Sequence, residues 1–411
     1  MPLPVTISGT AFPDQNYFCG PFKSSAGNFY VILLDSTDKS LIEAWKATDP
    51  TSSFTEQDSV DKPNLVTVLN SVWVYQVSDV LHIISSSSGA SGVDELSYHQ
   101  FNMATDNWDL VTEIVEASLA GGSEVDISCS IAVRSTADVI VLYNGDTDVI
   151  KGTVYRRVKY ARREAGIWTV GIAVDNGGAT NWFGSVIVPG SSDRMHFFFY
   201  DSTSFDAYQR TLNSVNSLEA FPGSFDALAG SGAIHHFNPG VHWTSGANEK
   251  VRCPYLDSTS KLSVAALNSA DAPTVSIVAT NISDNTVEDS VPSADLYPTA
   301  CMALETDKQH ILYSDDATQD LFRDVTGADN DTWGTDVEVL DAVTINRVSA
   351  SVYTRGGATE LAYVYDDAGT VKYNEVELVA AGPGSPYYVR TGGVPHMRIG
   401  RPGTFAGRTW D

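Results

Sequence analysis

The chain has 411 residues, 43% of them hydrophobic, and its 51 acidic residues against 25 lysines and arginines give a formal net charge of −26. This composition suffices for a folded core and excludes an intrinsically disordered chain. The charge argues against nucleic acid as the main partner, because phosphates are bound by clustered cations. No run reaches the roughly eighteen apolar residues of a membrane-spanning helix, so no membrane association is expected.

Two features concern the compartment in which the protein works. The first residues, Met1 to Thr6, lack the basic and apolar regions of a secretory signal peptide, so we expect release by cell lysis rather than by secretion. Four cysteines are present and none belongs to a CxxC pair, which predicts reduced core residues rather than a disulfide framework. The cysteines are Cys19, Cys129, Cys253 and Cys301.

A short pattern recurs seven times along the chain: an apolar run, a small acidic turn and a second, alternating run. Its turns begin near residues 35, 85, 144, 201, 257, 315 and 366, at intervals of 50 to 59 residues. A fixed period of this size indicates a repeat architecture.

Each repeat contains up to four strand-like runs and almost no helical periodicity. The first runs are 17–23, 71–77, 127–134, 182–188, 241–244, 300–305 and 348–354. The runs after the turns are 41–47, 96–103, 154–160, 207–212, 262–267, 321–325 and 371–376. A fourth run often starts at an aromatic residue: Phe54, Trp108, Trp168, Phe221 or Trp333. The sequence therefore predicts an all-β, seven-bladed β-propeller with four-stranded antiparallel blades, and six blades is the alternative because the turn after residue 85 is expanded.

The two ends of the chain receive different predictions. Residues 1–380 should form the propeller, with Val5–Ser8 as the outer strand of the last blade and Tyr387–Arg390 as a rival for that place. Residues 381–411 are rich in glycine and proline and are net basic, which fits either a closing strand or a docking tail for an acidic neighbour. The candidate contact residues there are Arg398, Arg401 and Arg408.

The acidic turns should lie on the same face as the connections between blades, because the second-to-third turn of an antiparallel blade points that way. Aspartate followed by Ser, Thr or Gly commonly closes a hairpin turn through its own backbone. Where two such turns converge, their oxygens could instead hold Ca²⁺. The candidates on this face are Asp201, Asp257, Asp315 and Asp366.

Three histidines gather in the run that enters the fifth repeat: His235, His236 and His242, followed by Trp243. Three imidazoles could bind a transition metal, but their spacing matches no standard zinc pattern. The alternative is an aromatic and polar rim of the central channel.

One strongly basic run, 154–164, falls on the third strand of a blade. Arg156, Arg157 and Lys159 are the candidate contacts for an acidic subunit or an anionic glycan. The alternative is that these cations pair with the abundant carboxylates of the protein itself.

Two resemblances complete the sequence evidence. The turns Ala104-Thr-Asp-Asn-Trp108 and Ala328-Asp-Asn-Asp-Thr-Trp333 resemble degenerate Asp-boxes of the sialidase-like propellers, although no residues match that family's arginine triad. The unprocessed N-terminus, acidic strands and Gly/Arg tail resemble propeller proteins of tailed-phage particles. Fold resemblance alone does not assign an activity.

No GxSxG, P-loop or dinucleotide-binding motif is present. We therefore expect recognition rather than catalysis, and no cofactor apart from Ca²⁺ at the acidic turns. The leading hypothesis is a structural or adhesive virion protein that contacts other subunits, a host glycan or a receptor, with oligomers set by particle symmetry. A carbohydrate hydrolase or lyase at the channel mouth and a free lectin-like module are the alternatives.

Overall fold

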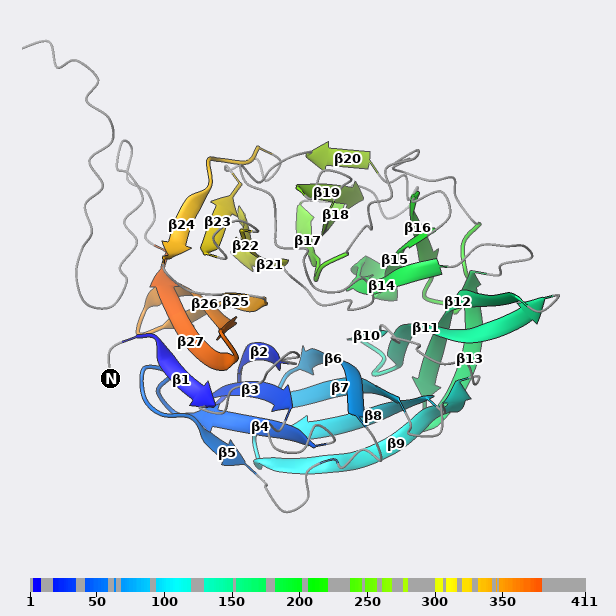
Figure 1. The fold of residues 1–411 in the computed structure, drawn as a ribbon, viewed down its shortest axis with the longest axis horizontal. Helices are drawn as coiled ribbons and strands as arrows, with labels where there is room; N and C mark the ends of the chain where they lie inside the picture. The colour runs from blue at the N-terminus through cyan, green and yellow to red at the C-terminus, as the bar shows by residue number, and fades with distance from the viewer. Residues whose placement is uncertain are drawn as a thin grey trace, which may run out of the picture.

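Seven antiparallel sheets, one for each predicted repeat, form a ring around a central axis in the computed structural model (Figure 1). We number these blades 1 to 7 in chain order. Six blades have four strands and blade 4 has three described strands, so the prediction of an all-β propeller with four-stranded antiparallel blades is confirmed. The structure describes residues 3–8, 18–34, 41–57, 63, 68–88, 94–119, 129–150, 153–174, 182–201, 206–220, 237–245, 248–256, 261–267, 276–279, 300–305, 308–315, 320–326, 332–341, 345 and 347–378.

Within each blade the chain moves outward from the axis, strand by strand (Figure 1). Blade 1 contains β2 (Phe18–Lys23), β3 (Phe29–Leu34), β4 (Ile42–Ala47) and β5 (Thr55–Gln57). Blade 2 contains β6 (Val68–Val77), β7 (Val80–Ser88), β8 (Asp94–Asn102) and β9 (Asn107–Leu119). Blade 3 contains β10 (Cys129–Val133), β11 (Val139–Ile150), β12 (Thr153–Glu164) and β13 (Ile167–Val174). Blade 4 contains β14 (Trp182–Pro189), β15 (Met195–Asp201) and β16 (Ala207–Leu212), with the short 3₁₀ turn η1 (Ser191–Asp193) after β14.

The second half of the ring follows the same plan. Blade 5 contains β17 (Val241–Ser245), β18 (Asn248–Leu256), β19 (Leu262–Leu267) and β20 (Ser276–Ala279). Blade 6 contains β21 (Ala300–Glu305), β22 (Lys308–Ser314), β23 (Leu321–Val325) and β24 (Val337–Leu340). Blade 7 contains β25 (Val348–Arg355), β26 (Ala358–Asp367) and β27 (Thr370–Glu377), and β1 (Val5–Ser8) is its outer strand.

Apolar side chains fill the spaces between successive blades. The described residues form seven hydrophobic clusters, and each cluster draws on two neighbouring sheets. The second strands of the blades therefore carry apolar residues on both faces: every residue of β3 and every residue of β15 is buried. This double burial explains why the second strands read in the sequence as continuous apolar runs rather than as alternating ones.

The first strand closes the ring, as the sequence predicted. Val5 lies opposite Tyr373 and Thr6 opposite Lys372 in an antiparallel pairing of β1 with β27. Val5 and Ile7 are buried in the cluster shared by blades 7 and 1. The rival strand 387–390 and the predicted tail 381–411 lie outside the described residues.

Two hairpins are longer than the sequence suggested. The turn expected near residue 85 lies inside β7, and the turn expected near residue 144 lies inside β11. Serine and glycine suggested turns there, yet Ser85, Ser86 and Ser87 are buried in the ladder and the Ser85 hydroxyl lies 2.8 Å from the His99 ring nitrogen Nε2. A polar residue can stay in a buried strand when its hydroxyl has such a partner.

A recurring hydrogen bond links the turns between first and second strands of neighbouring blades. The Ser25 amide donates to the Asp79 carboxylate at 2.6 Å, and the Ser135 amide donates to the Asp193 carboxylate at 2.7 Å. The Ser191 amide donates similarly to the carboxylate of Glu249, which lies at the start of β18. We call these three contacts the turn latches, and they fix the positions of adjacent blades on the face opposite the inter-blade connections.

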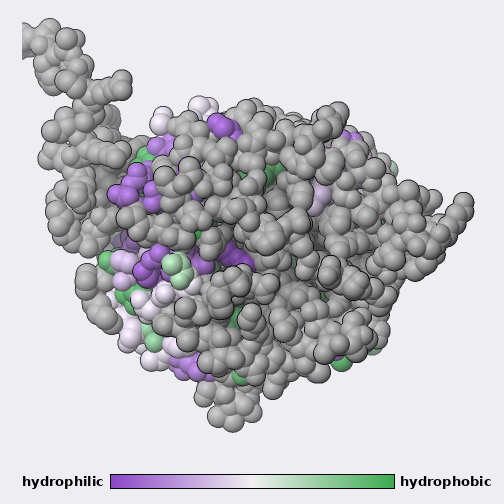
Figure 2. Space-filling view, viewed as in Figure 1, coloured by the Kyte–Doolittle hydropathy of each residue, from purple (hydrophilic) through white to green (hydrophobic). Residues whose placement is uncertain are grey.

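The surface of the described residues is mixed in character. In the view of Figure 2 hydrophilic and pale residues predominate, with small hydrophobic spots between them. No helix in the described part of the chain is long and apolar enough to cross a membrane.

Candidate functional site

The histidine run predicted as a rim is only partly visible, because His235 and His236 lie outside the described residues. His242 and Trp243 belong to the inner strand β17. The His242 ring nitrogen Nε2 lies 3.5 Å from the Glu249 carboxylate, which also lies 3.6 Å from the His196 ring of blade 4. Burial lowers the pKa of His242, although the Glu249 charge opposes that shift.

The binding role predicted for His242 stays a prediction, and the structure adds where its side chain lies. The His242 side chain lies at the turn latch of blades 4 and 5, beside Glu249. Trp243 lies under the guanidinium of Arg252, whose central carbon is 5.3 Å from the ring centre. Among the residues described, no group of three metal-ligating side chains is placed to hold a metal ion.

The acidic turn residues are buried rather than displayed. Asp201, Asp315 and Asp366 are at most 8% exposed. The Asp201 and Asp315 amides close their hairpins through backbone carbonyls at 3.0 Å, and the Asp366 carboxylate accepts the Gly369 amide at 2.7 Å. These three aspartates are therefore buried in their hairpin turns rather than exposed, and a binding role for them stays a prediction. Asp257 lies outside the described residues.

Most of the described cations of the basic strand form ion pairs within the protein. Lys159 is 6% exposed and its ammonium bonds to the Glu116 carboxylate on β9 of blade 2. Arg163 donates to both oxygens of Glu113 on the same strand, at 3.0 and 2.8 Å. Lys159 is thus not an exposed partner contact, because it neutralises a carboxylate of the neighbouring blade. Arg157 is half-buried, and the Arg156 side chain and Arg398, Arg401 and Arg408 lie outside the description.

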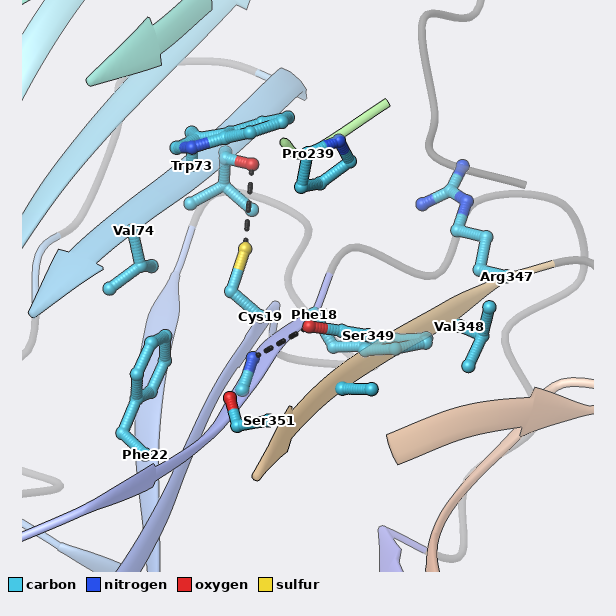
Figure 3. A pocket seen from close by; sticks show the side chains of 13 residues that line it. Phe18, Cys19, Phe22, Trp73, Val74, Pro239, Arg347, Val348, Ser349 and Ser351 are labelled. Atoms are coloured by element: carbon cyan, nitrogen blue, oxygen red, sulfur yellow. Dashed lines mark hydrogen bonds between the residues drawn. The ribbon is translucent and has the colours of Figure 1, made fainter. Parts of the chain in front are cut away.

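A pocket of about 180 Å³ lies at the axis, where the inner strands of blades 1, 2 and 7 approach the connection into blade 5 (Figure 3). We call it the axial pocket. It is lined by Phe18, Cys19, Gly20, Phe22, Val72, Trp73, Val74, Pro239, Arg347, Val348, Ser349, Ala350 and Ser351. The start of β2, the start of β25 and Pro239 place it toward the face of the inter-blade connections.

A bulge in β2 shapes one wall. The pairing of β2 with β3 shifts register between Cys19 and Phe22, and both of these side chains line the pocket. Gly20 lies in the bulge with a φ of 133° and donates its amide to the Ser349 hydroxyl at 3.3 Å. A side chain here would be strained and would approach the Tyr30 carbonyl at 3.1 Å, so the bulge requires glycine.

Pro239 is held from behind by the fully buried Asn238. The Asn238 amide donates to the Pro254 carbonyl at 2.9 Å, and its side-chain oxygen accepts the Ala300 amide at 3.3 Å. Gly240 packs so closely against β18 that an added Cβ would meet the Arg252 carbonyl at 2.4 Å. These contacts from blades 5 and 6 fix the proline opposite Trp73 (Figure 3).

The chemical character of the axial pocket favours recognition. The half-buried ring of Trp73 and the guanidinium of Arg347 lie on two sides of the pocket (Figure 3). Ser349 and Ser351 of β25 also line it. Burial raises the pKa of the Cys19 thiol to about 12, so this thiol stays protonated and is a poor nucleophile. The described lining contains no carboxylate, histidine or lysine that could serve as a general acid or base.

Sequence reasoning did not nominate Trp73 or Arg347. Trp73 looked like an ordinary member of the strand run 71–77 and Arg347 lay outside the run 348–354, and only ring closure brings β6 and the start of β25 to one axis. One usable signal was present: Arg347 is a cation directly before an inner strand, on the face where a propeller channel opens.

No family model and no curated protein matches the chain. Among solved structures, the BP39L lectin from Burkholderia pseudomallei superimposes with a TM-score of 0.57 at 10% identity, over 90% of this chain and 97% of the lectin. An α-L-arabinanase from Penicillium chrysogenum, complexed with arabinobiose, gives a TM-score of 0.51 at 10% identity, over 91% and 97% of the two chains. At this identity the likeness establishes the fold alone, a β-propeller. The resemblances to Asp-box turns and to phage propellers stay predictions.

Proposed function

We propose that this protein is a carbohydrate-recognition propeller and that the axial pocket holds one sugar unit. The observation that carries the proposal is that one pocket is lined by the Trp73 ring, the Arg347 side chain and two serine hydroxyls. A sugar ring presents an apolar C–H face that packs on an aromatic ring and hydroxyls that bond to polar groups.

The size of the axial pocket limits the ligand. Its volume of about 180 Å³ equals that of roughly six liquid water molecules at about 30 Å³ each. A single sugar ring or a chain end therefore fits better than an internal segment of a polysaccharide. The lectin and the sugar-bound arabinanase among the fold neighbours support a carbohydrate ligand without naming it.

Glycan-array binding followed by calorimetry with the best hit tests the proposal. Trp73→Ala and Arg347→Gln should each weaken binding by about tenfold or more, which corresponds to about 1.4 kcal/mol. Trp168→Ala is the matched control, since this half-buried tryptophan packs on Tyr98 between blades 2 and 3 and does not line the axial pocket. Unchanged affinity in both pocket variants, with unfolding temperatures close to wild type, would exclude the axial pocket.

A hydrolase or lyase remains the competing class. Glycoside hydrolysis ordinarily requires two carboxyl groups flanking the bond, and the described lining of the axial pocket supplies none. Incubation with a panel of neutral and acidic polysaccharides should therefore release no reducing ends. Sustained release that Trp73→Ala abolishes would replace recognition with catalysis.

For the biological setting we propose a virion appendage that presents this propeller to a host-surface glycan. The proposal is supported by the resemblance of the sequence to propeller proteins of tailed-phage particles. It is also supported by the basic segment 381–411 in a chain whose net charge is −26. Deleting 381–411 should leave a folded propeller that no longer enters particles, as measured by immunoblotting of purified virions. Normal incorporation would remove the docking role of this segment.

A further inference from the structure

A second and larger cavity, of about 700 Å³, lies between the hairpin tips of blades 3 and 4. The β10–β11 turn contributes Asp138, the β12–β13 turn contributes Arg163 and Glu164, η1 contributes Asp193, and the turn after β16 contributes Ser214 and Asn216. These turns lie on the face opposite the inter-blade connections, so this hairpin-tip cavity is separate from the axial pocket.

One side of the cavity is held in place across the blade boundary. Arg134 of blade 3 is 4% exposed, and its guanidinium donates to the Asn213 carbonyl at 2.8 Å and to the Asn216 side-chain oxygen. Asn213 in turn accepts the amides of Val215 and Ser217 at 3.1 and 2.9 Å. The turn 213–217 is therefore fixed before any ligand arrives, which reduces the entropy lost on binding.

The opposite side is fixed by a turn latch. Both oxygens of Asp193 are occupied, since they accept the Ser135 amide at 2.7 Å and the Ser135 hydroxyl at 2.8 Å. Glu164 pairs with Arg162 at 2.9 Å. Of the three lining carboxylates, only that of Asp138 makes no hydrogen bond or ion pair within the part of the chain that the structure describes.

Several polar groups of the lining keep unused hydrogen-bonding capacity. The side-chain oxygen of Asn216 accepts from Arg134, so its two amide hydrogens stay available to a ligand. Arg163 donates to Glu113 from Nε and from one terminal nitrogen, so its second terminal nitrogen stays available as a donor. With Asp138 as acceptor, the cavity offers donors and acceptors together.

These groups select the class of ligand. The lining carboxylates disfavour anions such as phosphate or sulfated sugars, since the nearby Arg134, Arg162 and Arg163 are already bonded to groups of the protein itself. A hard cation would find a single unused carboxylate, where several oxygen ligands are needed. A neutral ligand with many hydroxyls can use donors and acceptors at once.

We propose that the hairpin-tip cavity is a second saccharide site that takes a neutral sugar of about two units. Its volume falls within the range of about 300–1,000 Å³ typical of ligand pockets, several times that of the axial pocket. The protein would then bind glycans on both faces of the ring, through unrelated sets of residues.

Saturation-transfer NMR with maltose, lactose, cellobiose and chitobiose tests the second site. Asp138→Asn removes the negative charge of an acceptor, and Asn216→Asp removes the two amide donors. Both keep the shape of the side chain, and each should weaken binding at least tenfold. Asp109→Asn, an exposed carboxylate bonded to Asn102 in the β8–β9 hairpin, is the matched control and should bind as wild type. Hydrogen exchange should show protection of residues 134–138 and 213–217 when the bound disaccharide is added.

The outcomes separate the two sites. Binding that Asp138→Asn and Asn216→Asp weaken but Trp73→Ala leaves unchanged supports the hairpin-tip site. Binding lost only in Trp73→Ala overturns it and leaves the axial proposal standing. Failure of every disaccharide to give saturation transfer, or wild-type affinity in both cavity variants, also overturns it.

Discussion

Two buried histidines of blade 2 should make the propeller sensitive to acid. His82 is 8% exposed with its ring nitrogen Nδ1 2.6 Å from the Tyr98 hydroxyl, and His99 is fully buried between the Ser85 hydroxyl and the Val111 carbonyl. Burial lowers the pKa of both rings to about 4. The unfolded chain titrates its histidines near pH 6.5, so below that pH the unfolded state binds more protons than the folded state.

The sign and size of the effect follow from this difference. Stability is retained at neutral pH and lost as the pH falls from about 6.5 toward 4. Between about pH 7 and about pH 5 each histidine should remove about 2 kcal/mol from the free energy of unfolding, and the pair about 4 kcal/mol. Burial also lowers the pKa of His242 and of His310, so their contributions have the same direction.

Urea unfolding followed by tryptophan fluorescence at the two pH values measures this loss. A His82→Gln/His99→Gln variant should lose about 4 kcal/mol less than the wild type on acidification, and each single variant about 2 kcal/mol less, whatever its stability at neutral pH. Equal losses in the wild type and the double variant would refute the assignment to these rings.

Three further predictions concern closure, the turn latches and the thiols. Removing residues 1–8 should lower the urea midpoint, because burial of Val5 and Ile7 contributes about 1.5–3 kcal/mol for each side chain; an unchanged midpoint would show that β1 does not secure the ring. Asp193→Ala should cost about 1–3 kcal/mol in thermal unfolding by leaving the Ser135 amide without its acceptor, while Asp109→Ala should cost little. Iodoacetamide near neutral pH should label the native cysteines slowly and all four in denaturant by mass spectrometry, since Cys19 has a pKa of about 12 and the other three are buried; rapid native labelling of Cys19 would contradict its raised pKa.

The strands of the ring could be predicted because their signals are local. The expected runs 300–305 and 182–188 match β21 and β14 to within one residue. The outer strands were harder: Trp333 was expected to open a strand, but it forms an isolated bridge to Thr326 and β24 begins at Val337. Outer strands pack on one side only, so their sequence pattern is weaker.

The candidate sites depended on contacts that no local pattern encodes. Asp201 and Lys159 are residue types of the surface, yet Asp201 is buried at its hairpin turn and Lys159 is buried with its ammonium on Glu116 of the next blade. The axial pocket joins Trp73 from blade 2 with Arg347 before blade 7, and the hairpin-tip cavity needs Arg134 to reach Asn216 in the next blade. Such sites exist only after the blades are arranged in a ring, and the sequence could indicate the face but not these residues.

The pairing of β1 with β27 closes the ring, so the blades would keep the same neighbours if the chain were opened at a different connection between blades. Because Val5 lies opposite Tyr373, the first and last described strands are neighbours in one sheet. A circular permutant that leaves out residues 379–411, joins the end of β27 to β1 by a short linker and has new termini between β9 and β10 would keep every observed strand pairing. Each of the seven connections between blades could thus carry the new termini without a change in topology. A second protein could therefore be fused beside any chosen blade.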